Sequence, residues 1–299
     1  MNKKIAAIVV TYNRKVLLEE CITALVKAKE NSNLDIILID NASTDGTEEM
    51  IKEKFCAVTE YVNTGSNLGG AGGFNFGIKY AMQKNIYDYC WIMDDDTIVQ
   101  SDTLSVLLRK ADVLNNDFSF LSSVALWKDG TLCNMNVQKV SSKTVDNYEQ
   151  LKDGLAYIEY ASFVSLFINT EAIKKVGYPI KDFFIYGDDM EYTMRLNTYK
   201  NGFLVGESQV IHKMAANEGI NIIEVDSKRI ERYFYNYRNL LYIYRTYDGK
   251  EYKKYKLKCY YMIFKVLLKA KSDKFKRINA IRKALSADKK FNPVVETYY

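Results

Sequence analysis

The chain has 299 residues, 48% of them hydrophobic, and a formal net charge of +5 at pH 7. A chain of this length can bury one large α/β core and a smaller appendage. Its five scattered cysteines argue against a disulfide framework or a zinc-ligand spacing, and no run of about 20 apolar residues predicts a membrane-spanning helix. We therefore expect a cytoplasmic protein in a reducing compartment.

The first third of the chain alternates apolar, β-branched runs with segments of helical spacing. Ile5 to Val10 predicts a strand, and Leu17, Cys21, Ile22 and Leu25 follow at the spacing of one helix face. The alternation continues with strands at residues 34–39, 58–62 and 89–93 and with helices at residues 47–55 and 73–83. Buried strands that alternate with helices predict a parallel sheet covered on both faces.

Polar residues follow the end of each of these four strands. They are Thr11 to Arg14, Asp40 to Ser43, Asn63 to Gly70 and Asp94 to Asp96. Ligands of open α/β sheets bind at the carboxyl ends of the strands, so the four segments are expected to meet on one edge of the sheet. The sequence therefore predicts a ligand site at that edge.

The rest of the chain is less regular. A helix at residues 102–114 and a strand at 118–126 extend the sheet, and residues 127–157 are predicted as loops with room for a hairpin. A strand is expected at 163–168, and helices at 170–176 and 188–196. After about Asp226, tyrosines interleave with lysines and arginines in a helical pattern. We therefore divide the chain into an α/β domain, residues 1–225, and a helical C-terminal region, residues 226–299.

Three carboxylates, Asp94, Asp95 and Asp96, close the apolar run Tyr89 to Met93. Side chains alternate along an extended chain, so Asp94 and Asp96 are expected on one side and Asp95 on the other. Two carboxylates completed by substrate phosphates are typical of Mg²⁺ or Mn²⁺ in nucleotide chemistry. The alternative for an isolated Asp triplet is a solvated acidic turn.

The segment Asn67 to Phe74 carries four glycines at a strand-to-helix junction. Glycine permits close backbone approach, and a helix N-terminus exposes amide groups, which together favour a phosphate or a sugar. A dinucleotide-binding loop is the alternative. That alternative is weaker because the segment follows the third strand, not the first, and lacks the G-x-G-x-x-G order.

Together these segments resemble the inverting glycosyltransferases of family 2, which have the GT-A fold. The resemblance covers roughly residues 4–225 and rests on Val10 to Arg14, on Asp40 to Thr47 and on the Asp triplet. Within the family, Asn67 to Phe74 followed by Met93 to Asp96 resembles the bacterial galactofuranosyltransferases, with rhamnosyltransferases close behind.

The resemblance implies a donor site for a nucleotide-linked sugar. Its residues would be Thr11, Asn13, Arg14, Asp40, Asn41, Asn67, Gly69, Gly70 and Asp95. A carboxylate such as Asp40 can accept a hydrogen bond from the imide N–H of uracil or thymine. The alternative for Asp40 and Asn41 is that they only make a turn.

A second acidic cluster, with Asp188, Asp189 and Glu191, lies at a predicted helix start. Inverting transfer needs one base to deprotonate the acceptor hydroxyl. The resemblance implies that Asp189 is this base, that Asp188 binds the acceptor sugar, and that Glu191 and Arg195 support the helix start. The alternative is that the carboxylates only stabilise the N-terminus of the helix.

His212 is the single histidine and ends a predicted strand. The resemblance implies that it is a third metal ligand beside Asp94 and Asp96. A structural role is the alternative, because imidazole suits Mn²⁺ less well than carboxylate does. The metal, Mn²⁺ or Mg²⁺, would neutralise charge on the departing diphosphate.

The region from Tyr252 to Lys290 interleaves apolar residues with lysines. That composition is typical of contact with an anionic membrane surface, where a polyprenyl-linked acceptor would be met. Packing on the catalytic domain and a homo-oligomer interface are the alternatives. Nucleic-acid binding is not expected, because the chain contains no recognised nucleic-acid module.

We therefore expect a metal-dependent, inverting hexosyltransferase at the inner face of the cell membrane. Its reaction would move galactofuranose from UDP-galactofuranose to a growing cell-envelope polysaccharide such as O antigen or capsule. Rhamnose from a dTDP donor is the second interpretation, and a sugar nucleotidyltransferase and a non-catalytic glycan-binding protein are alternatives of other classes. The motifs leave the donor sugar open, because a single hydroxyl or methyl contact can exchange one sugar for another.

Overall fold

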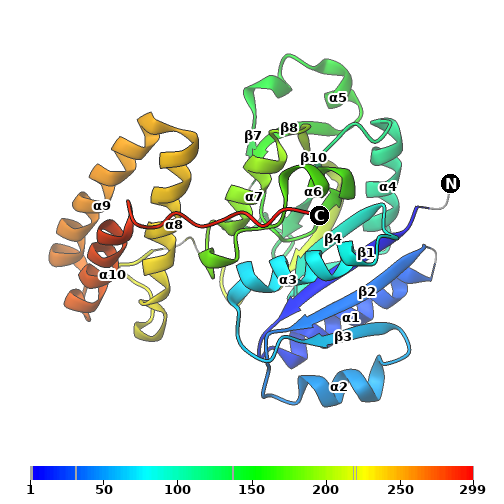
Figure 1. Ribbon diagram of the computed structural model, residues 1–299, viewed down its shortest axis with the longest axis horizontal. Helices are drawn as coiled ribbons and strands as arrows, with labels where there is room; N and C mark the ends of the chain where they lie inside the picture. Colours follow the sequence, from blue (N-terminus) through cyan, green and yellow to red (C-terminus); the bar gives the residue numbers. More distant parts are fainter. Residues whose placement is uncertain (1–2, 31, 137, 218, 220, 299) are drawn as a thin grey trace.

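The computed structural model describes residues 3–30, 32–136, 138–217, 219 and 221–298. A mixed sheet of ten strands has helices on both faces, and three C-terminal helices form a separate group beside it (Figure 1). The strand order is β3-β2-β1-β4-β9-β6-β10-β8-β7, and β5 pairs with β10 outside this path. This is the α/β fold with C-terminal helices that the sequence predicts.

The first four strands are parallel neighbours, as expected. They are β1 (Ile5–Thr11), β2 (Leu34–Asp40), β3 (Thr59–Asn63) and β4 (Tyr89–Asp94). Between them run α1 (Lys15–Lys29), α2 (Thr47–Lys54) and α3 (Gly69–Gln83). Helix α3 begins four residues before the predicted start, so the glycine-rich segment forms its first turn and not a separate loop.

The other half of the sheet is mixed. Its strands are β5 (Thr97–Val99), β6 (Phe120–Leu126), β7 (Lys139–Val140), β8 (Leu155–Tyr160), β9 (Leu166–Asn169) and β10 (Gly202–His212). Strand β9 lies antiparallel between β4 and β6, so the sheet is parallel only over its first four strands and at the β6–β10 pair. Residues 127–157, predicted as loops with room for a hairpin, also contain the short helix α5 (Tyr148–Lys152). Strand β7 pairs antiparallel with β8, which continues beyond this segment to Tyr160.

The helices of this half are α4 (Thr103–Val113), α5 (Tyr148–Lys152), α6 (Thr170–Val176) and α7 (Asp188–Leu196). Both faces of the sheet are buried. Along β4, Tyr89, Trp91 and Met93 join the core on one face, whereas Cys90 and Ile92 join the core on the other. Continuous apolar strands are what a sheet covered on both sides requires.

The C-terminal group consists of α8 (Arg232–Tyr247), α9 (Gly249–Lys269) and α10 (Lys274–Ala287). These helices share an apolar core of their own, which includes Tyr237, Cys259 and Ile281. After α10 the chain returns to the sheet domain, where Tyr178 N donates to Glu296 O at 2.9 Å (Figure 1). Within the described residues, none of the helices has the length and apolar character needed to cross a membrane.

Candidate active site

The ends of the first four strands meet on one edge of the sheet, as the sequence predicts. Asn41 N donates to Thr11 O at 2.9 Å, and the Thr11 hydroxyl donates to Asp95 Oδ2 at 2.7 Å. The loops after β1 and β2 interlock as well, because Asn13 Oδ1 accepts the Thr44 amide at 2.7 Å. Asn13 has a φ of 53°, a conformation that asparagine tolerates better than most residues.

Asp40 is fully buried and both of its oxygens have partners. Oδ1 accepts the Ser43 amide at 2.8 Å, and Oδ2 accepts the Tyr61 hydroxyl at 2.7 Å. Burial and the hydrogen bond to Asp40 raise the pKa of Tyr61 well above its ordinary value. Asp40 thus shapes its turn, and its contact with a donor base stays a prediction. No motif in the sequence identifies Tyr61 as a residue of the site.

The glycine-rich turn joins the strand ends to the second acidic cluster. Asn41 Nδ2 donates to Gly69 O at 3.0 Å, and Asn67 Oδ1 accepts the Gly69 amide at 2.9 Å. Gly69 has a φ of +71°, and a Cβ there would lie 2.2 Å from Phe184 O, so only glycine fits. A Cβ on Gly70 would meet no atom within 4 Å, which leaves that position open.

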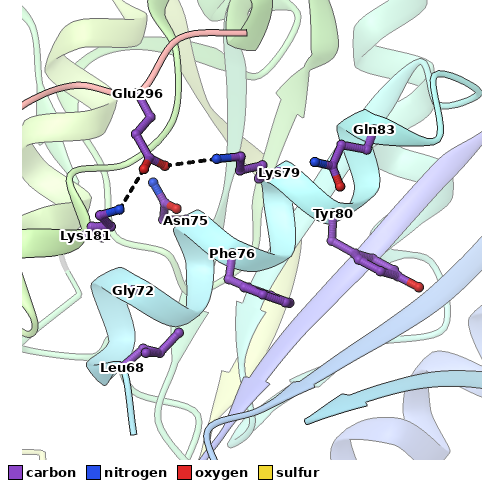
Figure 2. Close-up of a pocket in the computed structure, with 9 residues that line it drawn as sticks. All are labelled: Leu68, Gly72, Asn75, Phe76, Lys79, Tyr80, Gln83, Lys181 and Glu296. Carbon is purple, nitrogen blue, oxygen red and sulfur yellow. Dashed lines mark hydrogen bonds and ion pairs between the residues drawn. The ribbon is translucent and has the colours of Figure 1, made fainter. Parts of the chain in front are cut away.

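A cavity of about 460 Å³ lies against α3 (Figure 2). Lys79 and Lys181 both pair with Glu296 beside it, at 3.5 and 2.7 Å. The cavity is lined mainly by α3, and the returning C-terminal segment contributes Glu296. None of the residues predicted to bind the donor, the metal or the acceptor lines it. We therefore do not place the reaction there.

Asp94, Asp96 and His212 come together, with one candidate ligand atom from each lying within 4.8 Å of the others. Strand β5 brings this about, because it pairs antiparallel with β10 and sets Thr97 opposite His212. His212 Nε2 lies 2.8 Å from Asp96 Oδ1. The two carboxylates suit Mn²⁺ or Mg²⁺, and the imidazole is a third donor that these ions prefer less. The carboxylates therefore carry the fit to the metal that the sequence predicts.

His212 is paired with Asp96 in this structure. Burial alone would lower the pKa of His212, but the hydrogen bond to Asp96 and the nearby carboxylates raise it to about 10, so a cation bound at Nε2 would have to displace a proton. His212 Nδ1 lies 2.9 Å from Asn136 Oδ1, which can accept its proton and leave Nε2 as the ligand atom. Asn136 lies in the irregular segment before β7, where the spacing of apolar residues predicts neither a helix nor a strand.

Strand alternation does not govern the Asp triplet, because β4 ends at Asp94 and Asp95 and Asp96 form the turn to β5. Burial raises the pKa of Asp95 to about 7, although Arg14 opposes the shift. Arg14 Nη1 lies 3.2 Å from Asp95 Oδ1 and 2.6 Å from Asp96 Oδ2. Arg14 is half-exposed and already neutralises part of the triplet, so contacts of Arg14 and Asp95 with a donor remain predictions.

The acidic pair begins α7 after a sharp turn. Gly187, the residue before the helix, has a φ of 80°. Burial and the neighbouring Asp189 raise the pKa of Asp188 well above its ordinary value. Burial also raises the pKa of Asp189, to about 6, while its hydrogen bond from the Met190 amide opposes the shift. A carboxylate with such a pKa accepts a proton near neutral pH more readily than an ordinary aspartate does.

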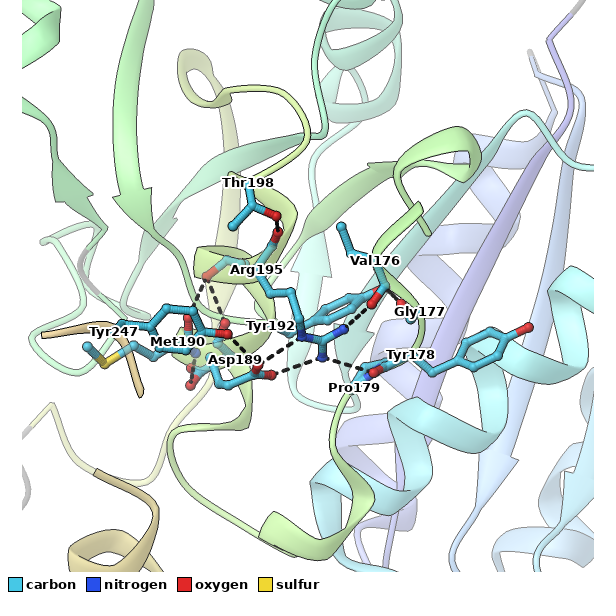
Figure 3. A network of polar contacts seen from close by, with 12 residues as sticks. Val176, Gly177, Tyr178, Pro179, Asp189, Met190, Tyr192, Arg195, Thr198 and Tyr247 are labelled. Atoms are coloured by element: carbon cyan, nitrogen blue, oxygen red, sulfur yellow. Dashed lines mark hydrogen bonds and ion pairs between the residues drawn. The ribbon is translucent and has the colours of Figure 1, made fainter. Parts of the chain in front are cut away.

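Glu191 and Arg195 hold α7 in place, and Figure 3 shows the contacts of Arg195. Arg195 Nε and Nη2 donate to the two Glu191 oxygens at 2.8 and 3.0 Å. The same guanidinium donates to Val176 O at 2.5 Å and to Tyr178 O at 2.9 Å, and the Tyr247 hydroxyl donates to Glu191 Oε1 at 2.9 Å. These contacts tie α7 to the segment after α6 and to α8.

Comparisons with known proteins agree with this geometry. The family described as "Glycosyl transferase family 2" matches residues 6–162, more than half of the chain. An abequosyltransferase of Salmonella typhimurium is 37% identical over 106 residues, which cover 34% of this chain and 31% of the relative. A galactofuranosyltransferase of Mycolicibacterium smegmatis is 27% identical over 64% of this chain and 65% of its own length. The match therefore spans less than two thirds of either relative.

A third relative is matched over most of both chains. The GalNAc(5)-diNAcBac-PP-undecaprenol β-1,3-glucosyltransferase of Campylobacter jejuni is 26% identical over 86% of this chain and 82% of its own length.

Two solved structures share the fold. A Pyrobaculum calidifontis mannosyltransferase in complex with GDP-Man and Mn²⁺ has a TM-score of 0.57 at 14% identity, covering 98% of this chain and 77% of that one. GalNAc-T7 with UDP, GalNAc and Mn²⁺ has a TM-score of 0.66 at 12% identity, covering 98% of this chain and 55% of that one. At this identity the likeness to both structures shows the fold alone.

Proposed function

Because this chain belongs to glycosyl transferase family 2 and is therefore an enzyme that transfers a sugar, we propose that it moves galactofuranose from UDP-galactofuranose to a polyprenyl-linked glycan. The observation that carries the proposal is the arrangement of two acidic clusters about one glycine-rich turn. Asp94, Asp96 and His212 lie on the strand-end edge, and the loop before Asp188 packs on Gly69. Family membership sets aside the sugar nucleotidyltransferase and the non-catalytic glycan-binding protein.

Asp94, Asp96 and His212 would hold Mn²⁺ or Mg²⁺. The bound ion would neutralise charge on the diphosphate leaving group. Around it, Thr11, Asn13 and Arg14 would contact the donor from the end of β1, and Asp40 and Asn41 from the end of β2. Asn67, Gly69, Gly70 and Asp95 would complete the donor site. Gly70 is suited to this role, because it is open at a helix N-terminus where amides face an anion.

Asp189 would be the general base. It would take the proton of the acceptor hydroxyl while that oxygen bonds to the anomeric carbon from the face opposite the diphosphate. The bond from the anomeric carbon to the diphosphate oxygen breaks in the same step, and its electron pair leaves with UDP. No covalent enzyme intermediate is needed. Asp188 would bind the acceptor sugar, and Glu191 and Arg195 would keep α7 in position.

The choice of galactofuranose is supported by the motif at residues 67–74 and by a relative that is a galactofuranosyltransferase. Other relatives carry abequose or glucose in their names, so the relatives do not single out one sugar. The motif at residues 67–74 keeps dTDP-rhamnose as the second candidate donor. A lipid-linked acceptor is supported by the undecaprenol-linked substrate named for the Campylobacter jejuni relative. A cell-envelope polysaccharide such as O antigen or capsule would be the product.

Nucleotide release from a panel of UDP- and dTDP-sugars, with and without Mn²⁺, tests the proposal. Metal-dependent release of UDP from UDP-galactofuranose in the presence of polyprenyl-linked acceptors is the expected result. Preference for dTDP-rhamnose would transfer the assignment to rhamnose. A folded protein that binds and turns over no member of the panel would contradict the proposed donor class.

The C-terminal region, which we place at residues 226–299, would bring the enzyme to the cytoplasmic face of the membrane. An exposed apolar stripe runs along one side of α9, with Leu257, Tyr260, Tyr261, Phe264, Leu267 and Leu268. Exposed lysines, including Lys253, Lys258 and Lys269, flank the stripe, whereas Cys259 and Val266 on the other side are buried in the helical core. Exposed apolar and basic side chains on one helix suit an anionic lipid surface.

Sedimentation with anionic vesicles tests this contact. The double substitution Phe264→Ser and Leu268→Ser should reduce the bound fraction, whereas Val145→Ser, an exposed apolar residue far from α9 in the chain, should not. Equal binding of all variants would contradict the membrane role. A change from dimer to monomer in the double variant would instead identify the stripe as an interface between copies of the chain.

A further inference from the structure

The loop that leads into the acidic pair has an unusual backbone. Phe184 has φ 63° and ψ −56°, and the Ile185 amide donates to Phe183 O at 2.7 Å, which closes a tight three-residue turn. Tyr186 follows with φ 68°. Bulky residues rarely adopt positive φ, and such strain persists only where the surroundings impose it. Contacts from outside the turn must therefore hold this conformation just before Asp188.

Helix α8 supplies the partners that the loop needs. Asn239 is fully buried, and its Nδ2 lies 3.0 Å from Phe183 O, 3.1 Å from Ile185 O and 2.7 Å from Tyr186 O. One side-chain amide thus faces three carbonyl groups of the same loop. A buried carbonyl without a donor is costly, so this amide favours the strained turn over alternatives that point the carbonyls elsewhere.

Arg238, the neighbour of Asn239, fixes the direction of that amide. Its Nε and Nη2 donate to Asn239 Oδ1 at 3.0 and 2.8 Å, so the amide nitrogen has to face the loop. Nη2 also donates to Asp182 O at 2.6 Å. The guanidinium lies over the Phe291 ring at 3.7 Å and, within the described part of the chain, makes no ion pair with a carboxylate. Its buried position is explained by these hydrogen bonds.

The opposite side of the loop rests on the predicted donor side. The Ala71 amide in the first turn of α3 donates to Phe184 O at 3.2 Å, and Gly69 leaves room for that carbonyl. The loop is therefore held between α3 and α8, and α7 with its acidic pair starts directly where it ends. A displacement of the loop would move Asp188 and Asp189 relative to the strand-end edge.

We propose that Asn239 is a positioning residue for the acidic pair, and that Arg238 fixes the Asn239 amide in the orientation this requires. The C-terminal helices then complete the active site, in addition to any role at the membrane. The inference rests on the proposed function for what Asp188 and Asp189 do, but the restraint on the loop is independent of the reaction.

The test compares Asn239→Ala with Asn236→Ala, a matched change on the same helix whose side chain makes no hydrogen bond among those found in the described residues. Asn239→Ala should lower kcat roughly 10- to 100-fold, because small misplacements of a catalytic group have effects of this size. The donor KM and the affinity for UDP with Mn²⁺ should stay within about twofold, because the strand-end edge is untouched. Asn236→Ala should change neither quantity.

Hydrogen exchange of residues 183–191 supplies a second readout that needs no turnover. In the Asn239→Ala variant, the backbone amides of these residues should exchange faster, whereas those of β1 to β4 should stay as protected as in the wild type. Unchanged kcat and unchanged loop protection would overturn the proposal, as would an equal loss in both kcat and donor affinity. If Asn239→Ala does not fold, Arg238→Lys decides by the same criteria, since it keeps the charge but cannot donate two hydrogen bonds to Asn239 Oδ1.

If the wild-type chain turns over no tested donor, the proposed function fails while the exchange data still judge the positioning role. Loss of protection confined to the loop would then support the inference about Asn239. Retained protection would reject it.

Discussion

The two sides of the site differ in which parts of the chain build them. The strand-end edge is built mainly from β1 to β4, four successive strands that lie side by side in the order β3-β2-β1-β4. The acidic side joins α7 to the turn after α6 and to Tyr247 and Asn239 of α8. One repeating strand-and-helix pattern builds the first side, so motif spacing specifies it well. The second side also needs α8 of the C-terminal group to pack against the sheet domain.

Asp189→Asn should separate the two sides most sharply. The amide cannot take the acceptor proton, so we expect kcat to fall by about 10²- to 10⁴-fold. Binding of UDP with Mn²⁺, measured by titration calorimetry, should be unchanged. Asp182→Asn, an exposed aspartate in the same loop, is the matched control and should behave as wild type. Full activity of Asp189→Asn would move the role of base to Asp188.

The contact between the two sides can be tested at neighbouring glycines. Gly69→Ala would place a Cβ at positive φ and 2.2 Å from Phe184 O, and should reduce the free energy of unfolding by about 1–3 kcal/mol. Gly70→Ala meets no atom and should be neutral or stabilising by up to about 1 kcal/mol, because alanine is the better helix former. Urea denaturation measures both values, and equal stability of the two variants would contradict the close approach.

Substitutions at His212 and at its partner Asn136 test the strand-end edge alone. His212→Ala should weaken Mn²⁺ binding roughly 10- to 100-fold, and Asn136→Ala about 10-fold, because a partner on the second ring nitrogen orients the ligand. Electron paramagnetic resonance of free Mn²⁺ in the presence of UDP measures the affinity. Met135→Ala, at the exposed residue next to Asn136, should leave the affinity unchanged. If His212→Ala binds Mn²⁺ with the wild-type affinity, the histidine is not a metal ligand and its role is structural.

The pH dependence of transfer tests the second side. Desolvation raises the pKa of Asp189 to about 6, and the base works only when deprotonated. At saturating donor and Mn²⁺, kcat should therefore be constant above this pKa and fall about tenfold per pH unit well below it. Because Asp188 and Asp189 titrate together, the inflection belongs to the pair. An inflection near pH 4 would mean that the carboxylate is solvated like an ordinary aspartate.

The strand-end edge was predictable because each part carries its own local signal. The apolar runs of β1 to β4 and the polar residues after them predict the meeting of Thr11, Asp40, Gly69 and Asp95. His212 needed the family resemblance, since nothing local says that β5 pairs with β10 and brings the imidazole to Asp96. The strand expected at residues 163–168 is formed as β9, but the parallel pattern gave no warning that it inserts antiparallel between β4 and β6.

The restraints on the acidic loop were beyond reach of sequence patterns. The side-chain amide of Asn239 and the guanidinium of Arg238 act on backbone carbonyls, and a carbonyl leaves no mark on the identity of the residue that bears it. Tyr61 and Asn136 were not predicted for a related reason. Each forms a hydrogen bond with a predicted site residue that is distant in the sequence. Such partners become visible only through the packing of the whole chain.

The dependence of the acidic loop on α8 has a consequence for the order of events during synthesis. A chain leaves the ribosome N-terminus first, and its early segments can fold before later ones exist. The strand-end edge and the carboxylates of the metal centre would thus be in place while Phe184 still lacks the amide that holds its turn. A protein that ends after residue 225 would be expected to bind the donor nucleotide without transferring its sugar. Such a fragment would compete with the full-length enzyme for the donor.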